Sequence, residues 1–185
     1  QHRGVERLLL HPSATRSAIV AETIAGDASI GHALAYCTAL EALSGTKVSL
    51  RAAAIRGIAL ELERLANHVG DLGALCTDVA FLPASAYLGR LRGEYLNLTA
   101  DICGNRFGRN LLRPGGVRFD IPPELAERIR KRLEALRRER DGRLGPNATF
   151  EQRRDAAAAL MAEALAKVVY EDDPEDQAEG HRRRR

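Results

Sequence analysis

Aromatic side chains are scarce in this sequence of 185 residues, which has no tryptophan, four tyrosines and four phenylalanines. The hydrophobic core must therefore be built from alanine, leucine, isoleucine and valine. Such a composition favours closely packed helices over a sandwich of two sheets. The length suits one domain with a substantial core better than two.

Cysteine is also rare, and its placement follows no pattern. Cys37, Cys76 and Cys103 are odd in number and far apart, and no CxxC pair occurs. This spacing indicates neither a disulfide framework nor a cysteine metal site, so no metal ligand is assigned. We expect buried thiols in a reducing compartment.

Long apolar runs, a signal peptide and an initiating methionine are all missing. We therefore expect a soluble chain that has been cut from a longer one. The net charge of +3 is too small to indicate nucleic acid as a partner. An acidic stretch over residues 171–179 is followed by four terminal arginines, so residues 171–185 are predicted to be a disordered, solvated tail.

Apolar residues recur at spacings of three and four along most of the chain, which predicts an all-α bundle of long helices. The expected helices cover residues 13–44, 49–76, 83–107, 122–142 and 149–169. Gly26 and Gly31 interrupt the first of them. Two glycines weaken a helix, so this helix is either broken here or packed closely against a neighbour.

Three groups of polar residues are candidates for chemistry. Ser29 and His32 are three apart and could touch, but no oxyanion hole or orienting carboxylate accompanies them, which argues against a nucleophile. Glu61, Arg64 and His68 share one stripe of the second helix. That stripe is either a solvated face or an interface.

The neighbouring stripe of the second helix carries Glu63, Asn67 and Asp71, with the same two interpretations. The loop from Arg113 to Val117 (RPGGV) contains two glycines that permit unusual backbone angles. It lacks the spacing of a phosphate-binding loop, so a tight turn between helices is the main interpretation.

Four short strings occur in an informative order: HRGVERL at residues 2–8, ALAYC at 33–37, RA followed by LELERLANH and DLGA within 51–74, and RPGGV at 113–117. Together they resemble the family formed by the D subunit of NADH-quinone oxidoreductase and the nickel-iron hydrogenase large subunits, in its hydrogenase-related, energy-converting branch. Each string is weak alone, but four in order are specific. The resemblance implies the helical core of that fold, in a truncated form.

The same resemblance suggests roles for individual residues. Arg3 and His68 match an arginine and a histidine that lie beside an iron–sulfur cluster of a partner subunit and tune its potential without ligating it. Thr23 lies at the position of the family's quinone-binding tyrosine. The first nickel-binding cysteine pair would fall at Ala25 and Ala28, so nickel-iron chemistry is not expected.

The resemblance ends near residue 124, and three regions are predicted: a family-like core at 1–125, a divergent helical extension at 126–170 and the charged tail. Glu61, Arg64, Arg113, Gly115 and Gly116 are the expected interface residues. Quinone is the one small ligand that the resemblance allows, and the iron–sulfur cluster would belong to a small partner subunit.

The function implied by the resemblance is that of an oxidoreductase-type subunit, cytoplasmic and peripheral on the inner face of the cell membrane. It would accept electrons from the iron–sulfur subunit and pass them toward quinone. The alternative is a non-catalytic structural or assembly subunit that keeps the partner-binding helices. A nucleic-acid binder using residues 128–143 is the third interpretation, but acidic residues interrupt the arginines of that segment.

Overall fold

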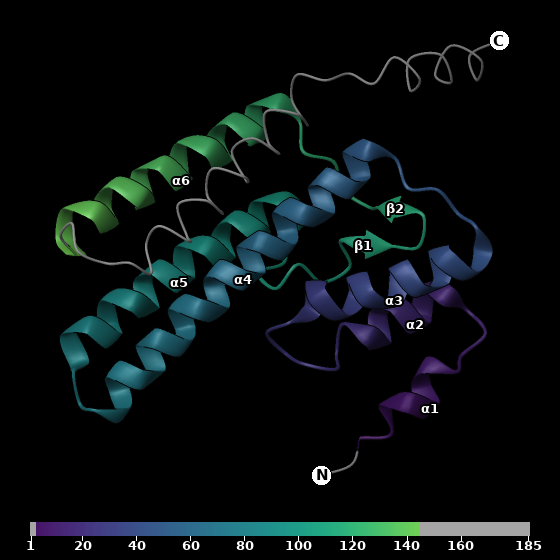
Figure 1. Ribbon diagram of the computed structural model, residues 1–185, viewed down its shortest axis with the longest axis horizontal. Coiled ribbons are helices and arrows are strands. Elements are labelled where there is room, and N and C mark those ends of the chain that lie inside the picture. The colour runs from purple at the N-terminus through teal and green to yellow at the C-terminus, as the bar shows by residue number, and fades with distance from the viewer. Residues whose placement is uncertain (1–2, 145–185) are drawn as a thin grey trace.

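The computed structural model describes residues 3–144, with side chains as far as residue 139, and this part of the chain is mostly helical (Figure 1). The elements in order are α1 (Val5–Leu9), α2 (Ala14–Ala21), α3 (Ser29–Ser44), α4 (Leu50–Asp78), α5 (Leu82–Cys103), β1 (Leu112–Arg113), β2 (Gly116–Val117) and α6 (Pro123–Leu144). The described part of the chain is therefore mostly helical, as predicted. It is not purely α-helical, because the RPGGV segment forms a short β-hairpin. The helix expected at 149–169 and the tail at 171–185 lie outside the described residues.

The helix expected at 13–44 is broken in two. The Ser13 hydroxyl caps α2 by accepting the Arg16 N–H at 3.4 Å, and α2 ends at Ala21. A turn follows, and α3 begins at Ser29. A methyl group at Gly31 would lie 3.3 Å from Glu63 Oε1 of α4. Both explanations considered for the glycines therefore apply: the helix breaks near Gly26, and Gly31 allows close approach of α4.

Helices α4 and α5 form an antiparallel hairpin (Figure 1). The Ser49 hydroxyl caps α4 by accepting the Ala52 N–H at 3.2 Å. At the same open end of the hairpin, Gly104 with φ +75° stops α5 at Cys103, which is earlier than the predicted end at residue 107. Helix α6 runs antiparallel to α5 and is joined to it by ion pairs such as Arg132–Glu94 at 2.7 Å (Figure 1).

Aliphatic side chains form the core, as the composition predicted. The most deeply buried are Ile30, Ile55, Ile58, Leu62, Leu111, Ile121 and Ile129. Cys37 is buried among them, whereas Cys76 and Cys103 are partly exposed, and all three are free thiols. Within residues 3–144, no helix combines the length and the hydropathy that crossing a bilayer requires.

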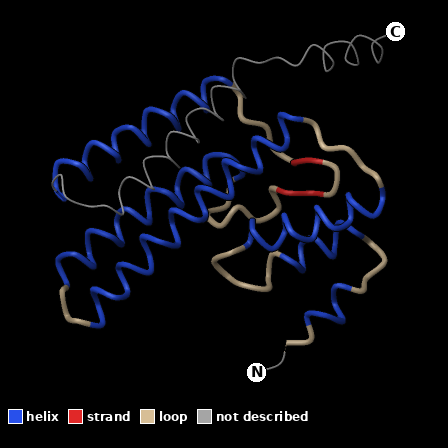
Figure 2. The backbone as a smooth tube through the Cα atoms, viewed as in Figure 1, coloured by secondary structure: helices blue, strands red, loops and turns tan. Residues whose placement is uncertain are grey.

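The hairpin of β1 and β2 pairs Leu112 with Val117 and Arg113 with Gly116 in antiparallel register (Figure 2). Gly115 turns the chain with φ +84°, in the left-handed region that favours glycine. The hairpin lies against α3 and α4 and joins α5 to α6 (Figure 2). It is therefore part of the packed core and not a free loop.

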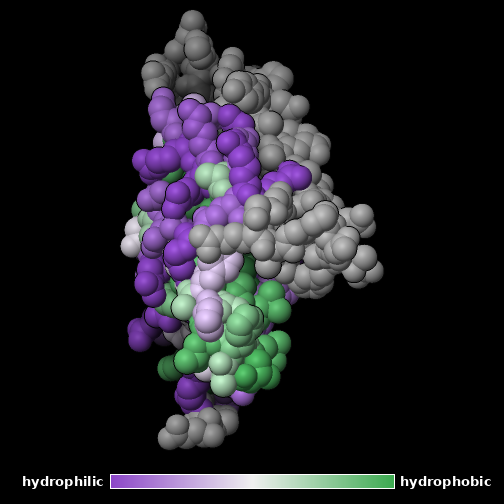
Figure 3. All heavy atoms as spheres, turned by 90° about the vertical axis from the view of Figure 1, so that its left-hand side faces the viewer, coloured by the Kyte–Doolittle hydropathy of each residue, from purple (hydrophilic) through white to green (hydrophobic). Residues whose placement is uncertain are grey.

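The turn between α4 and α5 exposes an apolar patch at the far end of the molecule. Its members are Leu75, Val79, Phe81 and Leu82, each more than half exposed. Figure 3 shows this end with a hydrophobic area next to the strongly polar surface of α6.

Candidate functional site

Arg3 and Thr23, two residues singled out by the sequence, come together in the structure. The Arg3 guanidinium donates hydrogen bonds to the Thr23 carbonyl at 2.9 Å and to the Ile24 carbonyl at 2.5 Å. The start of the described chain thereby holds the turn that follows α2. Two carbonyls are weaker partners than a carboxylate, so the positive charge of Arg3 is not neutralised there.

Glu63 of α4 holds the other end of the same turn. Its carboxylate accepts the N–H groups of Ile30 and Gly31 at 2.7 and 2.9 Å, which caps the N-terminus of α3 from another helix. Burial raises the pKa of Glu63, and the two N–H groups and His32 partly oppose this effect. Glu63 is thus a helix cap and not part of a solvated face.

Asn67 lies one turn further along α4 and completes this contact. Its side-chain amide donates to the Asp27 carbonyl at 3.0 Å. Glu63 and Asn67 therefore hold residues 27–31 against α4. These hydrogen bonds explain why this stripe of α4 is polar. Asp71, the third member of the stripe, is exposed.

The stripe of Glu61, Arg64 and His68 is on the solvent side of α4. Glu61 Oε2 accepts from Arg64 Nε at 2.9 Å, and both side chains are about one third exposed. His68 is exposed. Among the described residues, no hydrogen bond joins His68 to Arg3 or Thr23. The stripe has the exposure that an interface needs, and its role stays a prediction.

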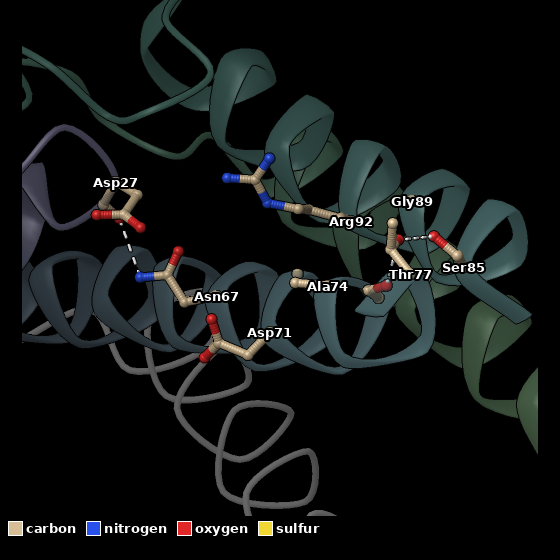
Figure 4. A pocket seen from close by; sticks show the side chains of 10 residues that line it. Asp27, Asn67, Asp71, Ala74, Thr77, Ser85, Gly89 and Arg92 are labelled. Atoms are coloured by element: carbon tan, nitrogen blue, oxygen red, sulfur yellow. Dashed lines mark hydrogen bonds between the residues drawn. The ribbon is translucent and has the colours of Figure 1, made fainter. Parts of the chain in front are cut away.

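A groove of about 400 Å³ lies between α4, α5 and the Asp27 turn (Figure 4). It is lined by Asp27, Asn67, Gly70, Asp71, Gly73, Ala74, Thr77, Ser85, Gly89 and Arg92. Among the lining residues, Thr77 of α4 and Ser85 of α5 share a hydrogen bond of 2.7 Å. The guanidinium of Arg92 reaches over α4 toward the end where Asp27 and Asn67 lie (Figure 4). We call this the Arg92 groove.

The RPGGV hairpin is held by a buried ion pair that the sequence did not reveal. Arg56 of α4 donates to Glu41 Oε1 at 2.6 Å and to the Arg113 carbonyl at 2.9 Å. Glu41 Oε1 also accepts the Gly115 N–H at 2.7 Å. Hydrogen bonds from Arg56 hold the pKa of Glu41 below its usual value, against the effect of burial. The sequence offers no signal for this pair, because the burial of Arg56 is known only from the structure.

This ion pair changes how the expected interface residues are understood. Gly115 and Gly116 direct their backbone groups inward, because the Gly116 carbonyl also accepts from Arg56 at 3.0 Å. The side chain of Arg113 is exposed. The Gly115 N–H and the carbonyls of Arg113 and Gly116 are therefore used within the chain. Gly115 and the Arg113 side chain are exposed, and the interface role of these residues stays a prediction.

The acidic, histidine and cysteine side chains do not converge on a metal site in the part of the chain that the structure describes. Across those residues, no group of three such side chains is arranged to hold a metal ion. Alanines stand at positions 25 and 28, where the resemblance placed the family's first cysteine pair.

The buried carboxyl group of Glu22 allows a test of how burial changes a pKa and, through it, the stability of the fold. It is 3% exposed and accepts the Asn110 N–H at 2.7 Å, and burial raises its pKa. A raised folded-state pKa means that Glu22 favours folding most at low pH, and that this contribution is lost as the pH rises through that pKa. Glu22→Gln keeps an acceptor for Asn110 and removes the charge.

We expect Glu22→Gln to gain stability relative to the wild type between pH 4.5 and pH 7.5, measured as the free energy of unfolding in urea at both values. Glu124→Gln removes a charge from an exposed side chain and serves as the control. Equal effects of the two variants at both pH values would contradict this account of Glu22.

Known proteins match this chain over much of its length. Residues 78–169 match the model of the family described as respiratory-chain NADH dehydrogenase, 49 Kd subunit. The chain therefore belongs to a family of respiratory-chain NADH dehydrogenase subunits, which the four sequence strings resembled.

More particularly, it belongs to the family of the D subunit of NADH-quinone oxidoreductase. It is 36% identical over 135 residues to NADH-quinone oxidoreductase subunit 4 of Thermus thermophilus, a match covering 73% of this chain and 33% of that protein. It is 32% identical over 136 residues to the D subunit of the same enzyme from Helicobacter acinonychis and from Helicobacter pylori, covering 74% of this chain and 33% of each.

The chain thus spans about a third of the length of the relatives it matches. The family match also extends to residue 169, well beyond residue 124, near which the resemblance seen in the sequence ended. The segment at 126–170 that was set apart as divergent is therefore largely within the matched region.

Proposed function

We propose that the chain is the partner-binding helical core of a subunit in a multi-subunit redox complex, peripheral to the inner face of the cell membrane. The partner is a small iron–sulfur subunit that packs against the stripe of Glu61, Arg64 and His68. The proposal rests on two neighbouring stripes of α4. Glu61, Arg64 and His68 are accessible to solvent. Glu63 and Asn67 instead form hydrogen bonds to the turn at residues 27–31.

Arg3 and His68 would act on the partner's cluster through charge and hydrogen bonding. His68 is exposed and can donate a hydrogen bond to an acceptor on the partner. Arg3 keeps its charge beside the Thr23 turn. A nearby cation and a donor both raise the potential of a cluster, because they stabilise its reduced, more negative state.

Quinone does not fit the Thr23 position as the resemblance suggested. The Thr23 hydroxyl donates to the Val20 carbonyl at 2.7 Å, so its proton is used within the turn that ends α2. A quinone oxygen needs a donor, and this side chain supplies none in the present arrangement. We therefore derive no quinone step from this chain's residues.

That hydrogen bond favours a second candidate, a structural or assembly subunit that binds the same partners without carrying out the redox reaction. The two candidates share the interface on α4 and differ in whether electrons pass. Both predict that loss of the stripe separates the chain from its partners.

We expect the tagged chain, purified from its native host, to bring down a small iron–sulfur subunit with iron and without nickel, and Arg64→Glu to reduce this recovery about tenfold. A reversed charge opposite a complementary surface costs enough for such a loss. Arg138→Glu on α6, a side chain 80% exposed, is the control and should leave recovery unchanged.

The two candidates separate in the recovered complex. If the chain takes part in electron transfer, the recovered complex passes electrons from the partner's cluster to an added acceptor, and His68→Ala changes the rate of this transfer while His11→Ala does not. An intact complex that passes no electrons supports the structural subunit. Recovery of the chain alone and free of iron would overturn both.

A further inference from the structure

The apolar patch at the turn between α4 and α5 faces water although its side chains are hydrophobic. Leu75, Val79 and Leu82 are 61, 74 and 63% exposed, and Phe81 is 57% exposed. Figure 3 shows a continuous hydrophobic area at this end of the molecule. Single exposed apolar residues are ordinary on protein surfaces, whereas a contiguous group of them marks an interaction surface.

The turn that carries the patch is held by its own hydrogen bonds. The Phe81 N–H donates to the Cys76 carbonyl at 2.8 Å. The Ala80 N–H donates to the Thr77 carbonyl at 2.9 Å, and the Thr77 hydroxyl shares its hydrogen bond with Ser85 of α5. Ala80 has φ +59°, which is strained for a residue other than glycine. The patch is therefore presented on a fixed frame and not on a loose loop.

Leu75 and Val79 lie on the same face of α4 as the stripe of Glu61, Arg64 and His68. Each residue advances a helix by about 100° and 1.5 Å, so these positions fall within an arc of about 60° and a length of about 27 Å. All of these side chains are accessible to solvent. Helix α4 thus presents one exposed face, which is polar toward its N-terminus and apolar toward its C-terminus.

The chain segment that forms the patch carries charges of one sign. No lysine or arginine occurs between residues 65 and 89, whereas Asp71 and Asp78 do. Asp78 directly precedes Val79 and is exposed. Its carboxylate has no ion-pair or hydrogen-bond partner among residues 3–139. A surface complementary to the patch therefore carries lysine or arginine beside its apolar side chains.

Two other occupants fit the patch less well. The cytoplasmic leaflet of a membrane carries anionic lipids, which repel Asp78. A second copy joined through the same patch by twofold symmetry would bring two Asp78 carboxylates together. Four side chains are also far fewer than the roughly 20–30 residues that each partner contributes to a stable interface. A partner that also covers the polar part of the α4 face meets neither difficulty.

We propose that the α4 face from Glu61 to Val79 is one docking surface, and that the apolar patch at its end seats in a hydrophobic depression of the partner, ringed by lysine or arginine. The inference rests on the proposed function, because the occupant is the same small iron–sulfur subunit. The patch drives association through buried apolar area. Asp78 pairs with the surrounding cations and fixes the orientation.

Photocrosslinking in the native host tests which surface covers the patch. The tagged chain carries p-benzoylphenylalanine in place of Phe81, and the complex is purified after ultraviolet irradiation. We expect a crosslink to the small iron–sulfur subunit, in a segment that mass spectrometry shows to contain apolar residues with lysine or arginine. The same photoreactive residue in place of Leu43, which is 86% exposed on α3, should not reach that segment. A crosslink from position 81 to a second copy, to lipid or to a segment without a basic residue, or no crosslink in a recovered complex, would overturn the proposal.

Recovery of the complex separates this proposal from the proposed function. The double variant Val79→Ser and Phe81→Ser should lower recovery of the iron–sulfur subunit about tenfold. Asp78→Lys should lower it as well, because it places like charges together. Leu43→Ser is the matched control and should leave recovery unchanged. If Arg64→Glu loses the partner and the double serine variant keeps it, the polar stripe binds and the apolar patch does not. If neither variant loses the partner, the proposed function fails too.

Discussion

Replacing Glu41 by glutamine should lower the free energy of unfolding by about 3–5 kcal/mol, because it leaves Arg56 charged, buried and without its partner. The two side chains are 6% and 9% exposed, so water does not compensate for the loss. The glutamine NH₂ group would also face Arg56 Nη1, which in the wild type donates to Glu41 Oε2 at 3.0 Å. Urea unfolding followed by circular dichroism measures the change.

A surface pair and a double variant are the controls for Glu41. Glu134→Gln breaks an ion pair with Arg130 in which both partners are more than 40% exposed, and it should cost less than about 1 kcal/mol. The combination of Glu41→Leu with Arg56→Met removes both charges and should be much less harmful than Glu41→Gln alone. Equal losses in the single and double variants would show that the ion pair is not the cause.

The ion pair of Glu41 and Arg56 also predicts how the stability of the fold changes in acid. Arg56 holds the pKa of Glu41 below 4.5, so the stability that Glu41 supplies is present above about pH 4.5 and is lost as the pH falls through its folded-state pKa. Glu41→Gln should therefore differ from the wild type at pH 7 and approach it in acid.

Gly108→Ala should lower the free energy of unfolding by about 2–4 kcal/mol, the sum of backbone strain and overpacking. Gly108 has φ +66°, and an added methyl group would lie 2.8 Å from Ile30 Cγ1 and 3.4 Å from Thr99 Cγ2. Ile30 is fully buried, so it has little room to move. Thermal or urea unfolding gives the change directly.

Gly104 provides a matched control for Gly108. It has a similar φ of +75°, but nothing lies within 4 Å of an added methyl group. Gly104→Ala should therefore show the backbone strain alone, about 1 kcal/mol. If both alanine variants lose the same stability, the contact with Ile30 contributes nothing and the packing argument is wrong.

Much of this fold could be predicted from the sequence because helical periodicity is a local signal. The apolar stripe of the second helix predicted residues 49–76, and α4 covers Leu50–Asp78. The break between α2 and α3 was less certain, since it depends on Glu63 capping the N-terminus of α3 from a residue 33 positions away. Periodicity within one segment cannot show such a contact.

The candidate site was predictable only where the family strings mark it. They brought Arg3 and Thr23 to attention, and the structure places them in hydrogen-bond contact. They did not indicate Glu41 and Arg56, which are 15 residues apart on different helices and look like ordinary surface charges in sequence. Nor did the strings show that the Thr23 hydroxyl donates a hydrogen bond to the Val20 carbonyl, because only the atomic structure reveals that contact.

The uninterrupted length of α4 has a consequence for how this protein can vary. One helix carries Arg56 under the hairpin, Glu63 under the Thr23–Gly31 turn, His68 on the exposed stripe and Gly70 under Arg92. Each residue added to a helix rotates everything beyond it by about 100°. A single insertion or deletion within α4 would therefore turn several of these side chains away from their partners at once, whereas length changes in the segment between α3 and α4 would leave their relative register intact.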